Sequence, residues 1–115
     1  MSSFVTALKS YGQHFLHDKI VLNNIIEVIK KYHKEEEIIE VGPGTGALTT
    51  FLLDEFKEIT CVEVDQRCIE YLNLNLKPKH SGLTILEADF LKLDLKELLQ
   101  KPTAVVGNFP YNISS

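Results

Sequence analysis

A glycine-rich turn constrains this chain more than any other feature. Residues 42–46 read Gly-Pro-Gly-Thr-Gly, and they follow a β-branched apolar run and precede a helical pattern. A strand that turns sharply into a helix through three glycines leaves a backbone surface with no side chains in the way. A nucleoside-sized cofactor can lie against such a surface. The turn therefore predicts a ligand site.

An acidic residue follows at the interval expected of a carboxylate that binds ribose hydroxyls. Glu63 ends the next predicted strand, 17 positions after Gly46, where an interval of about 20 residues is typical. The Gly-x-Gly-x-Gly spacing favours S-adenosylmethionine over a dinucleotide. Taken alone, the turn could equally be structural, and Glu63 could equally be a solvated strand end.

Strand and helix patterns alternate along the chain, which predicts an α/β fold with a parallel sheet and flanking helices. We expect residues 1–17 to form an irregular N-terminal arm and residues 18–115 to form part of a Rossmann-like domain, with Asp18 as the cap of its first helix. The predicted strands are 38–41, 59–64, 83–86 and 103–107, and the predicted helices are 19–32, 47–56, 66–75 and 94–100.

The composition of the 115 residues is that of one soluble domain, with 44% apolar and 24% charged residues. No apolar run approaches the ~20 residues of a membrane span. Cys61 and Cys68 lack metal-type spacing, so we expect two reduced thiols, no metal site and a cytoplasmic setting. The net charge of −4 argues against a broad surface for polyanions.

The position of the last predicted strand gives a further expectation. The chain ends eight residues after strand 103–107, and a four-stranded parallel sheet with one uncovered face is an unstable arrangement. We therefore expect an N-terminal portion of a longer protein, truncated after the fourth strand. The strand 103–107 should then be an open edge, and the fragment should self-associate through the open sheet.

A second cluster, Asn108-Phe109-Pro110-Tyr111, follows that strand at the carboxyl end of the sheet. An aromatic amine such as N6 of adenine is a poor nucleophile, because its lone pair is delocalised into the ring. The Asn carbonyl and a backbone carbonyl beside proline can each accept one N–H bond and direct the lone pair toward an electrophile. The tyrosine ring can stack on the base. A simple turn is the alternative interpretation.

Five segments together resemble the N-terminal half of the ribosomal RNA adenine dimethyltransferase family. They are residues 11–16 (Tyr-Gly-Gln-His-Phe-Leu), 40–46 (Glu-Val-Gly-Pro-Gly-Thr-Gly), 62–65 (Val-Glu-Val-Asp), 87–90 (Glu-Ala-Asp-Phe) and 108–115 (Asn-Phe-Pro-Tyr-Asn-Ile-Ser-Ser). The resemblance implies a Rossmann-like class I methyltransferase domain that binds S-adenosyl-L-methionine. This chain departs from the family at His14, Phe109 and an arm with few basic residues.

The resemblance also implies a role for each site residue. His14 and Leu16 would flank the methionine end of the cofactor, and Glu63 would bind its ribose. Asp89 would accept the adenine amine, although by itself it could be a helix cap. The glycines Gly42, Gly44 and Gly46 would form the floor. Asn108, Pro110 and Tyr111 would form the methyl-transfer site, where Asn108 also contacts the cofactor.

The implied activity is dimethylation of N6 of two adjacent adenines in small-subunit ribosomal RNA, linked to ribosome assembly. The partner would be the immature small ribosomal subunit. We expect the intact protein to be monomeric and this fragment alone to be inactive. One alternative is the related large-subunit dimethyltransferase that confers antibiotic resistance. Another is a relative without catalytic activity that acts in ribosome assembly or transcription.

Overall fold

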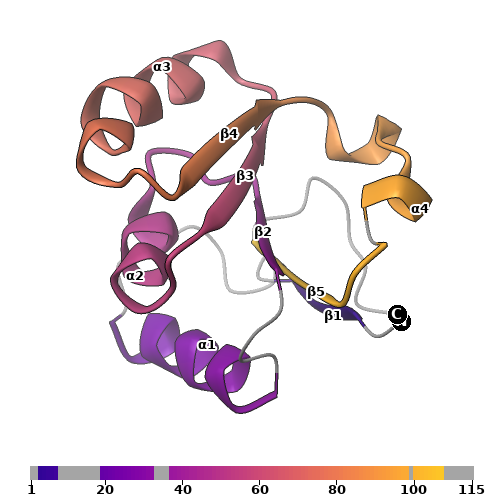
Figure 1. Cartoon of the computed structure of the whole chain (residues 1–115). Helices are drawn as coiled ribbons and strands as arrows, with labels where there is room; N and C mark the ends of the chain where they lie inside the picture. The colour runs from indigo at the N-terminus through magenta and orange to yellow at the C-terminus, as the bar shows by residue number, and fades with distance from the viewer. Residues whose placement is uncertain (1–2, 8–18, 33–36, 99, 108–115) are drawn as a thin grey trace.

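A five-stranded parallel sheet organises the chain, and the strand order is β1-β5-β2-β3-β4 (Figure 1). The computed structural model describes residues 3–7, 19–32, 37–98 and 100–107. The strands are β1 (Ser3–Ala7), β2 (Glu37–Val41), β3 (Ile59–Glu63), β4 (Leu83–Glu87) and β5 (Thr103–Gly107). Strands β2 to β5 match the four predicted strands to within one residue, so the predicted parallel α/β architecture is confirmed.

Three helices cover one face of the sheet: α1 (Lys19–Tyr32), α2 (Ala47–Glu55) and α3 (Gln66–Asn75) (Figure 1). Four apolar side chains of α1 recur at helical spacing and therefore lie on one side of the helix. As predicted, this side is buried in the core against the sheet. Each such side chain contributes roughly 1.5–3 kcal/mol when fully buried. These side chains are Leu22, Ile25, Ile26 and Ile29.

The segment after β4 lies on the opposite side of the sheet and includes the short helices η4 (Phe90–Lys92) and α4 (Leu95–Leu98) (Figure 1). Phe90 packs against sheet residues there, with Ala88 and Leu93 at the margin. The sheet residues that cluster with Phe90 are at most 3% exposed. The expectation that this face of the sheet is uncovered was therefore wrong. The prediction missed that the chain folds back over the sheet directly after β4. The buried sheet residues are Ile39, Val41, Val62 and Val105.

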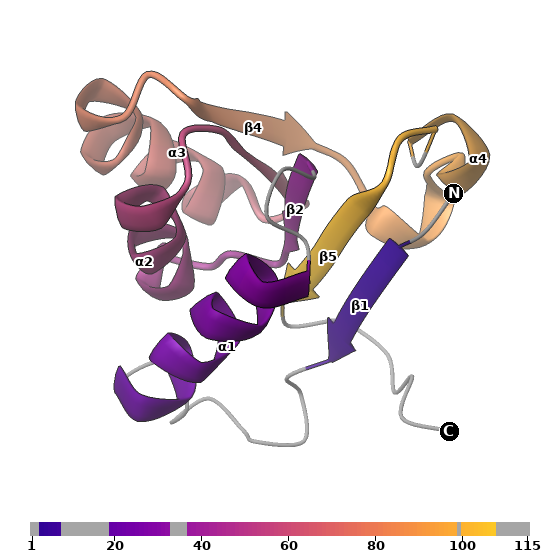
Figure 2. The same cartoon turned by 60° about the horizontal axis from the view of Figure 1, so that its bottom comes forward.

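Strand β1 corrects two further expectations. The arm was expected to be irregular, but its residues 3–7 form a parallel strand beside β5 (Figure 2). The pairing runs from Ser3 with Thr103 to Ala7 with Gly107. Strand β5 is therefore an inner strand between β1 and β2, and the edges of the sheet are β1 and β4. Residues 3–7 pair with a strand 100 positions away, so no local pattern in the arm indicates this strand. The division of the chain at residues 17 and 18 stays a prediction.

Some expectations concern groups on or between these elements. Asp18, the predicted cap of α1, lies outside the described residues. Cys61 is buried in β3 and Cys68 lies on α3, and both are free thiols. In the part of the chain that the structure describes, no helix is long and apolar enough to cross a membrane. A short helix, η3 (Lys77–Lys79), lies between α3 and β4.

Candidate functional site

The carboxyl ends of β2, β3 and β5 meet at one edge of the sheet. Val41 at the end of β2 pairs with Val62 on one side and with Gly107 on the other. One residue later, the N–H of Gly42 donates to the carbonyl oxygen of Val62 at 3.0 Å. Open α/β sheets bind their ligands outside this edge. The predicted glycine turn, called the glycine loop below (residues 42–46), therefore begins where a ligand is expected.

The glycine loop presents bare backbone to open space at Gly44. Its three glycines have positive φ angles of 65° at Gly42, 60° at Gly44 and 91° at Gly46. The N–H of Gly46 donates to the carbonyl of Pro43 at 2.9 Å, which closes the turn into α2. A Cβ added at Gly44 would meet nothing within 4 Å. The loop is open at Gly44, whereas Gly46 is buried, and the role of the loop in binding a cofactor stays a prediction.

Glu63 lies directly against this loop, because its carboxylate accepts a hydrogen bond from Gly44. One carboxylate oxygen, Oε1, accepts the N–H of Gly44 at 3.2 Å. The other, Oε2, accepts the N–H of Val64 at 2.9 Å and that of Asp65 at 3.0 Å. A carboxylate can accept about four hydrogen bonds, so acceptor capacity remains for a ligand hydroxyl. The structure thus brings together Gly44 and Glu63, two of the predicted site residues.

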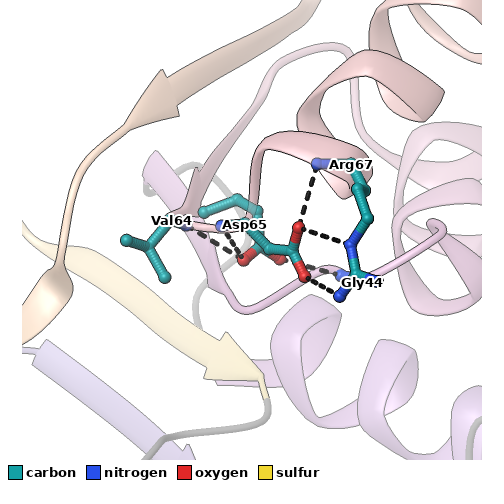
Figure 3. Close-up of polar contacts among 5 residues, drawn as sticks. Gly44, Val64, Asp65 and Arg67 are labelled. Atoms are coloured by element: carbon teal, nitrogen blue, oxygen red, sulfur yellow. Dashed lines mark hydrogen bonds and ion pairs between the residues drawn. The ribbon is translucent and has the colours of Figure 1, made fainter.

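The turn after Glu63 is fixed by a cap on α3. The Asp65 carboxylate accepts the backbone N–H of Arg67 at 2.9 Å and its guanidinium at 3.0 Å (Figure 3). Hydrogen bonds from Arg67 lower the pKa of Asp65, with a smaller contribution from the charge of Arg67. Asp65 is the N-cap of α3, whose start the sequence placed at Asp65 or Gln66. The cap holds the chain next to Glu63 in one conformation.

Asp89 lies two residues beyond the end of β4, which is the neighbour of β3. Glu63 and Glu87 are paired in register, and the N–H of Ala88 donates to the carbonyl of Glu63 at 3.0 Å. The Asp89 carboxylate accepts the N–H of Leu91 at 3.0 Å and so caps η4. The capping role that the sequence left open is therefore present. Binding of an adenine amine by Asp89 stays a prediction.

Five predicted site residues lie outside the described residues: His14, Leu16, Asn108, Pro110 and Tyr111. The described chain stops at Gly107, immediately before the Asn-Phe-Pro-Tyr segment. A Cβ added at Gly107 would lie 2.1 Å from the carbonyl oxygen of Val41. Glycine is therefore required for β5 to approach β2 this closely just before Asn108.

Sequence reasoning assigned no role to Glu40, which lies beneath the glycine loop. Its side chain is 2% exposed. It accepts a hydrogen bond from the Thr49 hydroxyl at 2.5 Å and a weak one from the Cys61 thiol at 3.8 Å. Burial raises the pKa of Glu40 to about 7, and the hydrogen bond from Thr49 lowers it by less. Burial also raises the pKa of the Cys61 thiol. A carboxylate within an apolar strand was the signal that could have identified this residue.

Comparisons with known proteins agree with this geometry. The family described as "Ribosomal RNA adenine dimethylase" matches residues 5–115. A "Ribosomal RNA small subunit methyltransferase A" of Parabacteroides distasonis is 45% identical over 107 residues, which are 93% of this chain and 39% of that protein.

Two solved structures share the fold and part of the sequence. The 23S rRNA methyltransferase ErmE is 29% identical with a TM-score of 0.61, over 80% of this chain and 37% of that one. A dimethyladenosine transferase from Plasmodium falciparum is 28% identical with a TM-score of 0.56, over 79% of this chain and 33% of that one.

The extent of these matches decides what they establish. The chain spans about two fifths of the length of the curated relatives it matches, while the family match covers nearly all of the chain itself. The fold is that of the class I methyltransferases. By sequence and by fold, this chain belongs to the ribosomal RNA adenine dimethylase family.

Proposed function

We propose that this protein transfers methyl groups from S-adenosylmethionine to N6 of two adjacent adenines in small-subunit ribosomal RNA. The contact between Gly44 and Glu63 carries the proposal, because it places a bare backbone surface beside a carboxylate that can accept hydroxyls. The names of the curated relatives support the small subunit as the source of the RNA. A cytoplasmic setting and a link to ribosome assembly belong to the same proposal.

The described residues fit this cofactor. The open space at Gly44 accommodates a flat ligand, and a Cβ at that position would project into it. Glu63 can accept about one further hydrogen bond after three from the backbone, which suits a ribose hydroxyl. Asp89 follows the neighbouring strand and can accept from an exocyclic amine. Gly42 and Gly46 complete the floor.

When bound, S-adenosylmethionine supplies a methyl group on a positively charged sulfur that is already activated for transfer. The protein therefore contributes mainly orientation and electrostatic stabilisation. The glycine loop and Glu63 orient the cofactor from one side. Asn108 and the backbone beside Pro110 would accept the two N–H bonds of the target amine, and Tyr111 would stack on the base. The resemblance, together with the chemistry of these groups, supports those three roles.

The activity test uses the intact gene product, S-adenosylmethionine with a tritium-labelled methyl group, and small subunits that lack the modification. We expect label in dimethyladenosine after nuclease digestion of the small-subunit RNA. An Asn108→Ala variant is the matched negative control. Subunit binding without label would instead support the relative without catalytic activity.

A second candidate function is methylation of large-subunit RNA. The similarity to ErmE, named as a 23S rRNA methyltransferase, favours it. The same assay with large-subunit RNA separates the two candidates. Label confined to the large subunit would overturn the small-subunit assignment while leaving the transfer chemistry intact.

A further inference from the structure

Glu40 and Thr49 lie on opposite sides of the glycine loop in the sequence and meet beneath it in the structure. Glu40 is two residues before Gly42 and Thr49 is three residues after Gly46. Their side chains are 2% and 0% exposed, and they share a hydrogen bond of 2.5 Å. This contact links the end of β2 to the first turn of α2, so it closes the base of the loop.

Neither side chain is placed to contact a cofactor. Glu40 belongs to the same face of the sheet as Ile38 and Cys61, which are part of the core beneath α1, α2 and α3. Gly44, in contrast, faces open space, and the Glu63 carboxylate beside it is 8% exposed. A buried carboxyl group costs stability unless hydrogen bonds compensate it. Its presence at this position calls for a role other than packing.

We propose that Glu40 is a positioning residue: its hydrogen bond to Thr49 holds the first turn of α2 against β2 and thereby sets the shape of the glycine loop. Two backbone hydrogen bonds depend on that shape. The N–H of Gly46 donates to Pro43, and the N–H of Thr50 donates to Gly46, both at 2.9 Å. The inference rests on the proposed function only where it concerns cofactor affinity.

The charge of Glu40 affects the closed loop in two opposing ways, through burial and through the hydrogen bond from Thr49. The elements packed around Glu40 bring few ionisable groups to it: β3 contributes Cys61 and Glu63, and α2 contributes the uncharged Thr49. The buried face of α1 is apolar, and β5 consists of Thr, Ala, Val and Gly. Among the described residues that act on Glu40 no cation compensates its charge. Burial disfavours the ionised form more than the hydrogen bond from Thr49 favours it, so an opened loop that lets water reach the carboxylate forms more easily once Glu40 ionises.

Amide hydrogen exchange on the whole chain tests the proposal without cofactor. Thr49→Val removes the hydroxyl at constant shape, and Thr49→Ser keeps it. We expect the Gly46 and Thr50 amides to exchange about tenfold faster in Thr49→Val and near the wild-type rate in Thr49→Ser. The Phe56 amide, bonded to Leu52 at the far end of α2, is the internal control and should not change.

The role of the proton is read from Glu40→Gln, which keeps an acceptor for Thr49 but never ionises. The ratio of the Gly46 exchange rates, wild type over Glu40→Gln, should be near one at pH 5.5 and should rise several-fold at pH 8. Equal rates in Thr49→Val and wild type would overturn the proposal, as would acceleration of Phe56 in step with Gly46 or a ratio that does not depend on pH. If Thr49→Val fails to fold, the Glu40→Gln comparison decides alone.

Calorimetry with S-adenosylhomocysteine adds the cofactor readout. We expect Thr49→Val to bind it several-fold more weakly than wild type and Thr49→Ser to restore the affinity. Unchanged affinity in Thr49→Val would contradict a positioning role toward the cofactor. No binding by the wild type would instead count against the proposed function, and the exchange rates would still decide the role of Glu40.

Discussion

The backbone N–H of Gly44 donates a hydrogen bond to Oε1 of Glu63 at 3.2 Å, which joins two motifs 19 residues apart. One residue belongs to the glycine loop and the other ends β3. The contact exists because β2 and β3 are adjacent and parallel, so both chains leave the sheet at the same edge. Glu63 therefore has two functions that mutations can separate: it holds the loop and it presents a carboxylate to a ligand.

Replacement of Glu63 with Ala should weaken binding of S-adenosylhomocysteine by about 2 kcal/mol, because hydrogen bonds to a charged group are lost. Isothermal titration calorimetry measures this change. The matched control is Glu70→Ala on the exposed side of α3, which removes the same charge away from the site and should leave the affinity unchanged. An unchanged affinity in Glu63→Ala would remove this residue from the binding site.

Two glycines of the same loop should respond differently to Ala. Gly44→Ala places its methyl in open space at a φ of 60°, so it should cost only about 1 kcal/mol of stability while it obstructs the cofactor. Gly46→Ala brings its methyl to 2.6 Å from a Leu76 methyl group within the core, so it should destabilise by about 2–3 kcal/mol. Urea unfolding and calorimetry of each variant separate the effects. Equal losses of stability would show that Gly44 does not face open space.

The sequence predicted this site because its motifs stand at strand ends. Gly42, Glu63 and Asp89 each follow a short β-branched run, and parallel pairing brings such ends together. The helix α1 was equally predictable, because its buried residues recur at helical spacing. Local patterns of this kind determine strand ends and helix faces without any knowledge of distant contacts.

The sequence could not show β1 or the surroundings of Glu40. Strand β1 pairs with a partner 100 positions away, Ser3 with Thr103, so nothing local fixes it. Glu40 reads as one polar residue in an apolar strand. Its contact with Thr49 depends on how α2 packs over β2, which periodicity does not specify. The roles of Asn108 and Tyr111 rest on the motif, since both lie outside the described residues.

Gly107→Ala should be more destabilising than either Gly44→Ala or Gly46→Ala. Its Cβ would lie 2.1 Å from the oxygen of Val41 and 2.7 Å from its nitrogen. Because these are backbone atoms of an inner strand, β2 and β5 would have to separate. We expect a loss of about 3 kcal/mol in the free energy of unfolding, measured by urea denaturation. Gly44→Ala is the control, and an equal cost in both variants would contradict the close approach.

Stability should fall as the pH rises from 5 to 8, because Glu40 holds its proton more tightly in the folded state. Its pKa is raised from 4.5 to about 7, so Glu40 ionises in the unfolded chain before it ionises in the folded protein. Over that range the free energy of the unfolded state falls relative to that of the folded state. The slope is about 1.4 kcal/mol per pH unit, and the total loss is about 3 kcal/mol. Urea unfolding at intervals of half a pH unit measures it.

Other shifted groups titrate outside this range. The lowered pKa of Asp65 affects stability only below its ordinary value of 3.8, where protonation removes the hydrogen bonds from Arg67. The raised pKa of Cys61 acts only above the ordinary thiol value of 9.0, where the unfolded chain loses its proton first. The window between pH 5 and 8 therefore isolates Glu40 among the groups whose pKa is shifted.

Glu40→Gln provides the decisive comparison, because the amide keeps an acceptor for Thr49 and has no proton to lose. The difference in unfolding free energy, Glu40→Gln minus wild type, should increase by about 3 kcal/mol from pH 5 to pH 8. Subtracting the variant removes every titration that the two proteins share. A difference that stays constant across this range would mean that Glu40 ionises at its ordinary pKa. The hypothesis that Glu40 is buried as a neutral carboxyl group would then have to be abandoned.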